Sequence, residues 1–257
     1  MINITEQQNS NILSREDRTI HAWYRFVLSY PPHLVRKYLD MFKLRKQAIV
    51  FDPFCGTGTT LVEAQMNGIR CIGADAHPFA AFVSKVKTHW SVPVEQLEQV
   101  RSEIISLVTS DLNGHKLEAL SLKHILLRED FGHYTCETAL SDDELKLIPS
   151  GFLSPKPLKR LLVLRRCIRR ACSNAEDEIK DFFDLAFCHV VANGAGNFAF
   201  GPEIYRTKPK TDYDVLGHFA EKTRCMIYDL KTINVRAPFY KESDVICGDS
   251  RDCSFLQ

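Results

Sequence analysis

The spacing of apolar residues in the first third of the chain predicts alternating helices and strands. A helical period at 34–42 is followed by a continuous apolar run at 48–52, which is typical of a buried strand. A short helix is expected over about 59–67, a second strand over 69–75 and another helix over about 77–88. This alternation predicts a parallel sheet whose crossovers are right-handed.

Helical periods dominate the middle of the chain. Four helices are expected there, over 94–110, 158–171, 175–191 and 215–231. Residues 193–214 are rich in Gly, Asn and Lys and are expected to form a long loop, and a last strand is expected over 244–247. An insertion of about 150 residues thus separates two parts of the sheet, and insertions of this length are usually functional.

These patterns predict an α/β fold that is divided into four parts. A flexible arm is expected first, because the N-terminal residues are polar and rich in Asn and Gln. The expected parts are the arm at 1–20, an α/β part at 21–91, the mainly helical insertion at 92–243 and a return to the sheet at 244–257.

Composition and charge exclude several classes of protein. The 257 residues are 45% hydrophobic and carry a formal net charge of +1, so no general basic field indicates a nucleic acid, although a local basic groove would still be compatible with one. The nine cysteines are scattered and form no CxxC pair, which argues against a disulfide framework or a zinc site. Without a signal peptide or an apolar run of about 18 residues, a reduced cytoplasmic protein that does not enter a membrane is expected.

The stretch from Asp52 to Thr60 is the strongest candidate for a binding site. It follows an apolar strand, contains Gly56 and Gly58, and opens into a helix. Glycines let the backbone approach a ligand closely, and the N-terminus of the helix offers N–H groups that have no partner within the helix. The stretch lacks the GK[ST] sequence of a phosphate-binding loop. Cys55 lies inside the turn and is interpreted as a small residue that fills it, because no histidine lies nearby in the sequence to activate a nucleophile.

The sequence Asp-Pro-Phe-Cys-Gly-Thr-Gly-Thr-Thr closely resembles the S-adenosylmethionine (SAM) loop of DNA amino-methyltransferases, which methylate the exocyclic nitrogen of adenine or cytosine. Further segments are also similar to this family, so that the resemblance covers most of the chain from about Asp17 onward; they are RFVLSYPPHLV, GIRCIGADAHPFAAFVSKVKTHW, SPKPLKRLLVL and NFAFGPEIY. The resemblance implies a partial Rossmann-like SAM-dependent methyltransferase sheet with a large helical insertion. It also implies DNA as a partner and a role in a restriction–modification system.

The resemblance implies a set of cofactor-binding residues and no metal ligand. The set is Asp52, Pro53, Phe54, Gly56, Thr57, Gly58, Thr59, Asp75 and Asp249. Asp52 ends the first strand, where its carboxylate would pair with the ammonium group of the ligand. Asp75 ends the second strand and would accept hydrogen bonds from ribose hydroxyls, or else cap the helix that follows. Asp249 would reach the adenine amino group, or else cap a turn.

One element of the family is missing from the sequence. Enzymes of this kind carry a catalytic (Ser/Asn/Asp)-Pro-Pro-(Tyr/Phe) tetrad, which binds the target amino group and stacks on the flipped base. The only Pro-Pro pair lies in Tyr30-Pro31-Pro32-His33, which lacks the required flanking residues and precedes the glycine loop. No catalytic residue is therefore assigned. We expect this chain to be the N-terminal half of a methyltransferase that is inactive without a second chain or a missing C-terminal segment.

Two groups of basic residues in the insertion are candidates for binding DNA phosphates. The helix expected at 158–171 carries Lys159, Arg160, Arg165, Arg166, Arg169 and Arg170, and the loop expected at 193–214 carries Arg206, Lys208 and Lys210. A solvated helix face explains the first group equally well. The two tryptophans, Trp23 and Trp90, are expected to pack in the core or beside SAM rather than to stack on bases.

Two alternative functions remain open from the sequence. The first is an RNA base methyltransferase, such as a guanine-N2 enzyme, because the same glycine loop occurs in that class. The second is a non-catalytic SAM- or DNA-binding module, either an inactive remnant or a regulatory subunit.

Overall fold

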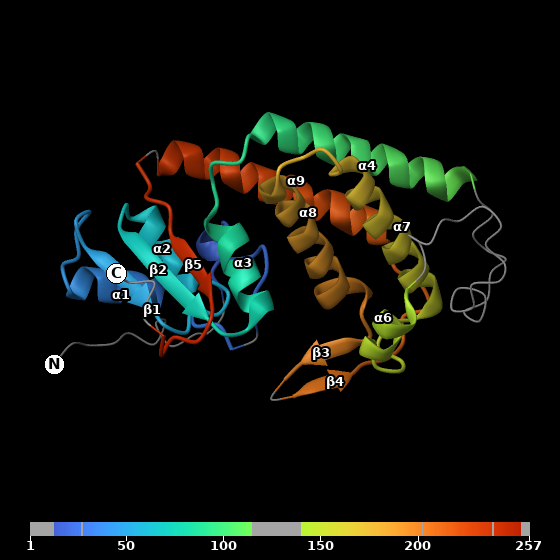
Figure 1. Cartoon of the computed structure of the whole chain (residues 1–257), viewed down its shortest axis with the longest axis horizontal. Helices are drawn as coiled ribbons and strands as arrows, with labels where there is room; N and C mark the ends of the chain where they lie inside the picture. The colour runs from blue at the N-terminus through green and yellow to red at the C-terminus, as the bar shows by residue number, and fades with distance from the viewer. Residues whose placement is uncertain (1–12, 27, 115–139, 202, 238, 253–257) are drawn as a thin grey trace. The chain divides into compact units, whose positions relative to one another are not determined.

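The computed structural model describes residues 13–26, 28–114, 140–201, 203–237 and 239–252 (Figure 1). The fold is mixed α/β and divides into two compact units. Unit 1 comprises Met1–Val92 and Tyr228–Gln257, and unit 2 comprises Pro93–Ile227. No helix in the described part of the chain is both long and apolar enough to span a bilayer.

Unit 1 is built on a small parallel sheet, as the alternating pattern predicted. Its strands are β1 (Ile49–Asp52), β2 (Arg70–Asp75) and β5 (Asp244–Cys247), in the order β1-β2-β5. Asp52 pairs with Gly73 and Asp75 pairs with Cys247, so the three strands end at the same edge (Figure 1). This carboxyl edge is the place where open α/β sheets bind ligands.

Three helices accompany the sheet of unit 1. They are α1 (Pro32–Met41), α2 (Thr59–Met66) and α3 (Pro78–Thr88). The lengths agree with the predicted ones to within a few residues, and α2 ends before Gly68, whose φ of +69° matches its role at the helix end.

The packing of α2 on the sheet is close. Leu61 of α2 and Cys71 of β2 are fully buried in one apolar cluster. A Cβ added to Gly73 would lie 2.7 Å from a methyl carbon of Leu61, so the strand must carry a glycine at this point. Trp23 and Trp90 are also buried, which confirms the expectation that they pack in the core.

The end of the expected N-terminal arm is packed against unit 1. A 3₁₀ turn at Glu16–Arg18 contains the buried Asp17, and Ile20 is fully buried. Residues 1–12 lie outside the described residues. Ordered packing therefore begins before residue 21.

Unit 2 is mainly helical. Its helices are α4 (Val94–Gly114), α6 (Asp142–Leu147), α7 (Pro155–Ala171), α8 (Asp177–Val190) and α9 (Val215–Arg236), and α9 continues into unit 1 from Tyr228. A π-helical turn at Val191–Ala195 extends α8. Phe183 of α8 and Phe219 of α9 are fully buried, with their ring centroids 6.3 Å apart.

The prediction of a long loop at 193–214 is wrong in part. This segment contains an antiparallel hairpin of β3 (Phe198–Phe200) and β4 (Ile204–Arg206). Each strand has only three residues, which is too short for an alternating pattern to be recognised, and the surrounding Gly, Asn and Pro residues indicate a loop.

Candidate functional site

The carboxyl edge of the sheet brings together the three aspartates that were predicted as site residues. Asp52 and Asp75 end β1 and β2, and Asp249 follows β5 by two residues. The backbone N–H of Gly248 donates to the carbonyl oxygen of Asp75 at 3.0 Å, which holds the end of β5 beside that of β2. Their position is as predicted, while their individual roles stay predictions.

The glycine loop between β1 and α2 folds back over the end of β2. The N–H of Cys55 donates to the carbonyl of Ala74 at 3.0 Å, and the N–H of Gly56 donates to a carboxylate oxygen of Asp75 at 2.9 Å. Gly56 and Gly58 have φ angles of +53° and +79°, in the left-handed region that glycine tolerates best. Both glycines are therefore needed for the shape of the turn.

The two glycines differ in their surroundings. A Cβ on Gly58 would lie 2.9 Å from Oγ of Ser84, which belongs to α3. A Cβ on Gly56 would meet nothing within 4 Å. The Ser84 hydroxyl also donates to the carbonyl of Gly56 at 2.7 Å. Gly58 is thus required by packing inside the protein, whereas the space beside Gly56 is open to a ligand.

Asp52 is held by groups from two segments. One carboxylate oxygen accepts the N–H of Phe54 at 3.1 Å, and the other accepts the hydroxyl of Tyr30 at 3.1 Å. The same hydroxyl contacts that of Thr60 on α2. Burial, together with the charge of Asp52, raises the pKa of Tyr30. Tyr30 was not predicted as a site residue, although it lies in the segment RFVLSYPPHLV, which resembles the family.

Asp75 contacts the backbone on both sides of its carboxylate. One oxygen accepts the N–H of Gly56 and the other accepts the N–H of His77 at 2.8 Å. The N-cap of α3 is His77 itself, whose Nδ1 accepts the N–H of Ala80 at 3.4 Å. The helix-capping alternative for Asp75 is therefore not what the structure shows. Each carboxylate oxygen has a second lone pair for another donor.

Asp249 has a local partner. Its two carboxylate oxygens share the Nε–H of Arg251, at 2.9 and 3.0 Å, and one of them accepts the backbone N–H of the same residue at 3.0 Å. These hydrogen bonds lower the pKa of Asp249. The geometry is that of the turn-capping alternative, and a ligand at this edge would compete with Arg251 for the carboxylate.

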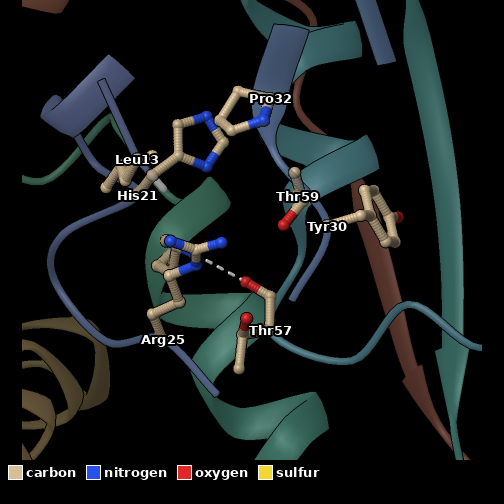
Figure 2. Close-up of a pocket in the computed structure, with 8 residues that line it drawn as sticks. Leu13, His21, Arg25, Tyr30, Pro32, Thr57 and Thr59 are labelled. Carbon is tan, nitrogen blue, oxygen red and sulfur yellow. Dashed lines mark hydrogen bonds between the residues drawn. The ribbon is translucent and has the colours of Figure 1, made fainter. Parts of the chain in front are cut away.

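A small pocket lies beside the glycine loop (Figure 2). It is lined by Leu13, His21, Arg25, Tyr30, Pro32, Thr57, Thr59 and Lys87. Lys87 of α3 is almost fully buried, and its ammonium group donates to the carbonyl of Thr57 at 2.7 Å and to that of Tyr24 at 3.5 Å. The lysine thus fastens both the loop and the N-terminal segment to α3.

A set of charged groups, all buried except the partly exposed Arg36, connects the N-terminal segment to α2. Nε2 of His21 and a carboxylate oxygen of Glu63 are 2.8 Å apart, and Arg36 contacts both Glu63 at 3.1 Å and Asp17 at 2.6 Å. Burial lowers the pKa of His21 and outweighs the opposing effect of Glu63. Because Glu63 lies one turn after the glycine loop, these contacts fix the start of α2.

The cysteine in the loop is a poor nucleophile. Burial raises the pKa of the Cys55 thiol to about 11, and its Sγ lies 3.7 Å from the Ser84 hydroxyl. This agrees with its interpretation as a small residue that fills the turn. The seven described cysteines are free, and the described residues contain no group of three or more His, Cys, Asp or Glu side chains suited to a metal ion.

Several basic residues of α7 pair with acidic neighbours in unit 2. Arg160 pairs with Asp212 at 2.5 Å, Arg165 pairs with Glu144 at 2.8 Å, and Arg166 contacts Asp111. The charge run therefore does not present a continuous positive surface. Arg160, Arg165 and Arg166 fit the ion-paired alternative to DNA binding, and Arg169 and Arg170 at the end of the helix are exposed.

Comparisons with known proteins identify relatives of parts of the chain. Residues 3–85 match the sequence model of the N6/N4 methyltransferase family, which is described as DNA methylase. The chain is 24% identical over 192 residues to type II methyltransferase M.MvaI of Kocuria varians, which is 74% of this chain and 37% of that protein. It is 31% identical over 107 residues to type II methyltransferase M.BsoBI of Geobacillus stearothermophilus, covering 40% of this chain and 21% of the relative.

A shorter stretch of the chain is similar to another class of enzyme. The chain is 43% identical over 44 residues to a tRNA (guanine(10)-N2)-dimethyltransferase of Methanocaldococcus jannaschii, which is 17% of this chain and 12% of that protein. The chain thus spans well under half the length of these curated relatives. No solved structure matches it significantly.

Proposed function

We propose that the chain belongs to the family of DNA amino-methyltransferases, which the matches to DNA methylase and type II methyltransferases support, and that unit 1 binds SAM at the carboxyl edge of its sheet for methylation of an exocyclic amino group in DNA. The observation that carries the proposal is the convergence of the open glycine loop with Asp52, Asp75 and Asp249 at one edge. When bound, SAM supplies the methyl group.

The glycine loop fits the amino-acid end of SAM. The open space beside Gly56 lets a ligand approach the backbone where a side chain would otherwise stand. No described side chain caps the N-terminus of α2 at Gly58, so its first N–H groups are suited to the ligand's carboxylate. Asp52 is placed to attract the ammonium group, with Tyr30 and the N–H of Phe54 holding its carboxylate in position.

We assign the adenosine part of SAM to the carboxyl ends of β2 and β5. We assign the ribose hydroxyls to Asp75, whose carboxylate is already oriented by the N–H groups of Gly56 and His77. We assign the adenine amino group to Asp249. Its carboxylate would give up hydrogen bonds from Arg251 and accept one from the ligand instead. The same site would include the remaining predicted residues of the glycine loop, Pro53, Phe54, Thr57 and Thr59.

We propose that methyl transfer also needs residues from another polypeptide segment, because residues 1–257 contain no (Ser/Asn/Asp)-Pro-Pro-(Tyr/Phe) tetrad. The edge strand β1 supports this proposal. Its sequence Ile-Val-Phe-Asp is typical of a strand buried on both faces, yet among the described strands it pairs only with β2, and Ile49 is 58% exposed. A further strand added to this edge would bury it and would bring the tetrad to the site.

The target base is cytosine, methylated at N4, or adenine, methylated at N6, and we place the reaction in a cytoplasmic restriction–modification system. The two relatives named as type II methyltransferases support this context. A second candidate is methylation of guanine-N2 in RNA, which is favoured by the 44-residue similarity to the tRNA enzyme. A non-catalytic SAM- or DNA-binding subunit is the third.

The cofactor site is tested by equilibrium dialysis with labelled SAM. Replacing Asp75 by Asn should weaken binding by about tenfold or more, because hydrogen bonds to a charged group contribute about 1.5–3 kcal/mol. Asp40→Asn, on the exposed face of α1, is the matched control and should bind normally. If Asp75→Asn retained the wild-type affinity, the ribose assignment would be wrong.

A methyl-transfer assay separates the candidate functions. The purified 257-residue chain should bind SAM without methylating duplex DNA, and transfer by this chain alone would refute the need for another segment. Once a segment that carries the tetrad is added, N4-methylcytosine or N6-methyladenine should appear in the DNA. Methylguanine in tRNA would favour the RNA enzyme instead, and the absence of any product would favour the non-catalytic subunit.

A further inference from the structure

The β3–β4 hairpin projects from unit 2 and is anchored at its base (Figure 1). Asn197 is buried there and makes hydrogen bonds in several directions. Its backbone N–H donates to the carbonyl of Phe152 at 2.7 Å, and its amide nitrogen donates to the hydroxyl of Ser154 at 2.9 Å. Its side-chain oxygen accepts the N–H of Lys210 at 2.9 Å. These bonds connect the hairpin to the start of α7.

Aromatic packing stiffens the same base. The rings of Phe152 and Phe198 stack with their centroids 5.5 Å apart, and Phe200 meets Phe198 edge-on at 5.6 Å. A Cβ on Gly196 would lie 2.3 Å from the Phe198 ring, so the backbone passes directly against it. The hairpin is therefore a positioned element rather than a loose loop.

The outer strand of the hairpin presents apolar and basic side chains to solvent. Ile204 and Tyr205 are 57% and 54% exposed, and Arg206 and Lys208 are also exposed. Tyr205 lies opposite the small Ala199, so nothing larger than a methyl group faces its ring across the ladder. Between residues 198 and 210 the chain has three cations and a single acid, Glu203. An exposed aromatic ring beside uncompensated cations is typical of nucleic-acid contacts.

The cations of the hairpin differ from those of α7. Arg160, Arg165 and Arg166 each contact a carboxylate of unit 2. Arg206 donates a hydrogen bond of 3.5 Å to the carbonyl of Ser150, a neutral acceptor, and forms no ion pair within the described part of the chain. The hairpin therefore offers exposed positive charge to a polyanion, which Arg160, Arg165 and Arg166 do not.

We propose that the β3–β4 hairpin is the element of unit 2 that binds the DNA duplex, with Arg206 and Lys208 on backbone phosphates and Tyr205 against the groove surface. This rests on the proposed function for the choice of DNA. A two-stranded ribbon fits the wide major groove of B-form DNA, whereas the major groove of A-form RNA is too narrow for it. The charge of the hairpin complements the phosphates on both sides of that groove.

The test is fluorescence anisotropy with a labelled DNA duplex over a range of salt concentrations. Replacing Arg206 and Lys208 by Ser should make the slope of log affinity against log salt concentration less steep, by the amount expected for about two phosphate contacts. The association constant should fall about thirtyfold at about 0.15 M salt. Each phosphate contact multiplies this constant by about the molar salt concentration raised to the power −0.9, and two contacts are lost. Tyr205→Ala should weaken binding without changing the salt dependence, because loss of the ring releases no counterions.

The matched control removes two positive charges from the exposed end of α7, by Arg169→Ser with Arg170→Ser. This control should weaken DNA binding less than about threefold, because charges that do not contact the DNA attract it only weakly through salt solution. Thermal unfolding verifies that all variants fold. Unchanged affinity of the hairpin variants, a larger loss in the α7 control, or tighter binding to duplex RNA than to DNA would each overturn the proposal.

Absence of duplex binding by the wild-type chain would overturn it as well. The cofactor assignment is measured separately, by dialysis with SAM in the absence of DNA. A hairpin variant that binds SAM normally but not DNA is the expected result. Failure of the wild-type chain to bind SAM would count against the proposed function and leave the DNA result to be judged independently.

Discussion

Three glycines with positive φ angles allow the proposed ligand-binding role of the glycine loop to be separated from its packing role. Gly56, Gly58 and Gly68 have φ angles of +53°, +79° and +69°, so an alanine at each meets a similar backbone strain of about 1 kcal/mol. Their surroundings differ. The difference between the three substitutions therefore isolates what a Cβ meets at each position.

Gly58→Ala should be the most destabilising substitution. Its Cβ would lie 2.9 Å from Oγ and 3.2 Å from Cα of Ser84, so rotation of the side chain alone does not relieve the overlap. Moving Ser84 also weakens its hydrogen bond to the carbonyl of Gly56, which is worth about 1 kcal/mol. With an overpacking cost of about 1–3 kcal/mol and the backbone strain, the free energy of unfolding should fall by about 3–5 kcal/mol.

Gly68→Ala is the control for backbone strain alone. The nearest atom to its Cβ would be the carbonyl oxygen of Phe239 at 3.5 Å, an ordinary contact, and a loss of about 1 kcal/mol is expected. Gly56→Ala should cost about as much in stability, because its Cβ would enter open space. It should, however, weaken SAM binding by about tenfold or more, since that space is assigned to the ligand.

Urea denaturation measures the stabilities, and dialysis with labelled SAM measures the affinities. Equal losses of stability for Gly58→Ala and Gly68→Ala would show that the contact with Ser84 does not restrict this position. Normal SAM affinity in Gly56→Ala would refute the assignment of the open space to the cofactor.

Two further predictions concern buried polar groups of unit 1. Lys87→Met should weaken SAM binding by about tenfold, because the carbonyl of Thr57 loses a charged donor, whereas Lys85→Met on the exposed face of the same helix should bind normally; equal dialysis affinities for the two would contradict this role. Burial lowers the pKa of His21 below its usual 6.5, so the unfolded chain binds a proton that the folded chain does not, and the free energy of unfolding should decrease as the pH falls below about 6.5. Urea titrations between about pH 5 and pH 7.5 should show this slope in the wild type and a flatter profile in His21→Gln, and identical slopes would remove His21 as its source.

The sheet and the glycine loop could be predicted because their signals are local. The apolar run that ends at Asp52 and the glycines that follow it specify a strand, a turn and a helix within a short window. The ends of the second strand and of the last strand were found by the same signals. Their convergence at one edge then follows from the parallel order of the strands.

The groups that hold the loop in place could not be predicted in the same way. Tyr30 and Lys87 contact Asp52 and Thr57 only after separate segments have packed together. For Lys87 the sequence does contain a signal, since it lies three residues after Ser84 and seven after Ala80, on the buried stripe of α3. A lysine on such a stripe suggests a buried donor.

The ion pairs of α7 show a second reason for failure. Its arginines share a sequence pattern with phosphate-binding helices, and only the fold reveals that Glu144 and Asp212 lie beside them. The hairpin was missed because three-residue strands carry no recognisable period. For α7 the decisive contacts join residues that are far apart in the sequence, whereas for the hairpin the strands are too short.

Hydrogen–deuterium exchange with and without SAM tests the central claim most directly, because it reports binding and its location together. SAM should slow exchange in peptides that cover 52–61, 75–80 and 248–252, while peptides from α7 and α8 of unit 2 should exchange as before. Protection confined to unit 2, or no protection of the glycine loop at saturating SAM, would contradict the claim that the carboxyl edge of this sheet holds the methyl donor.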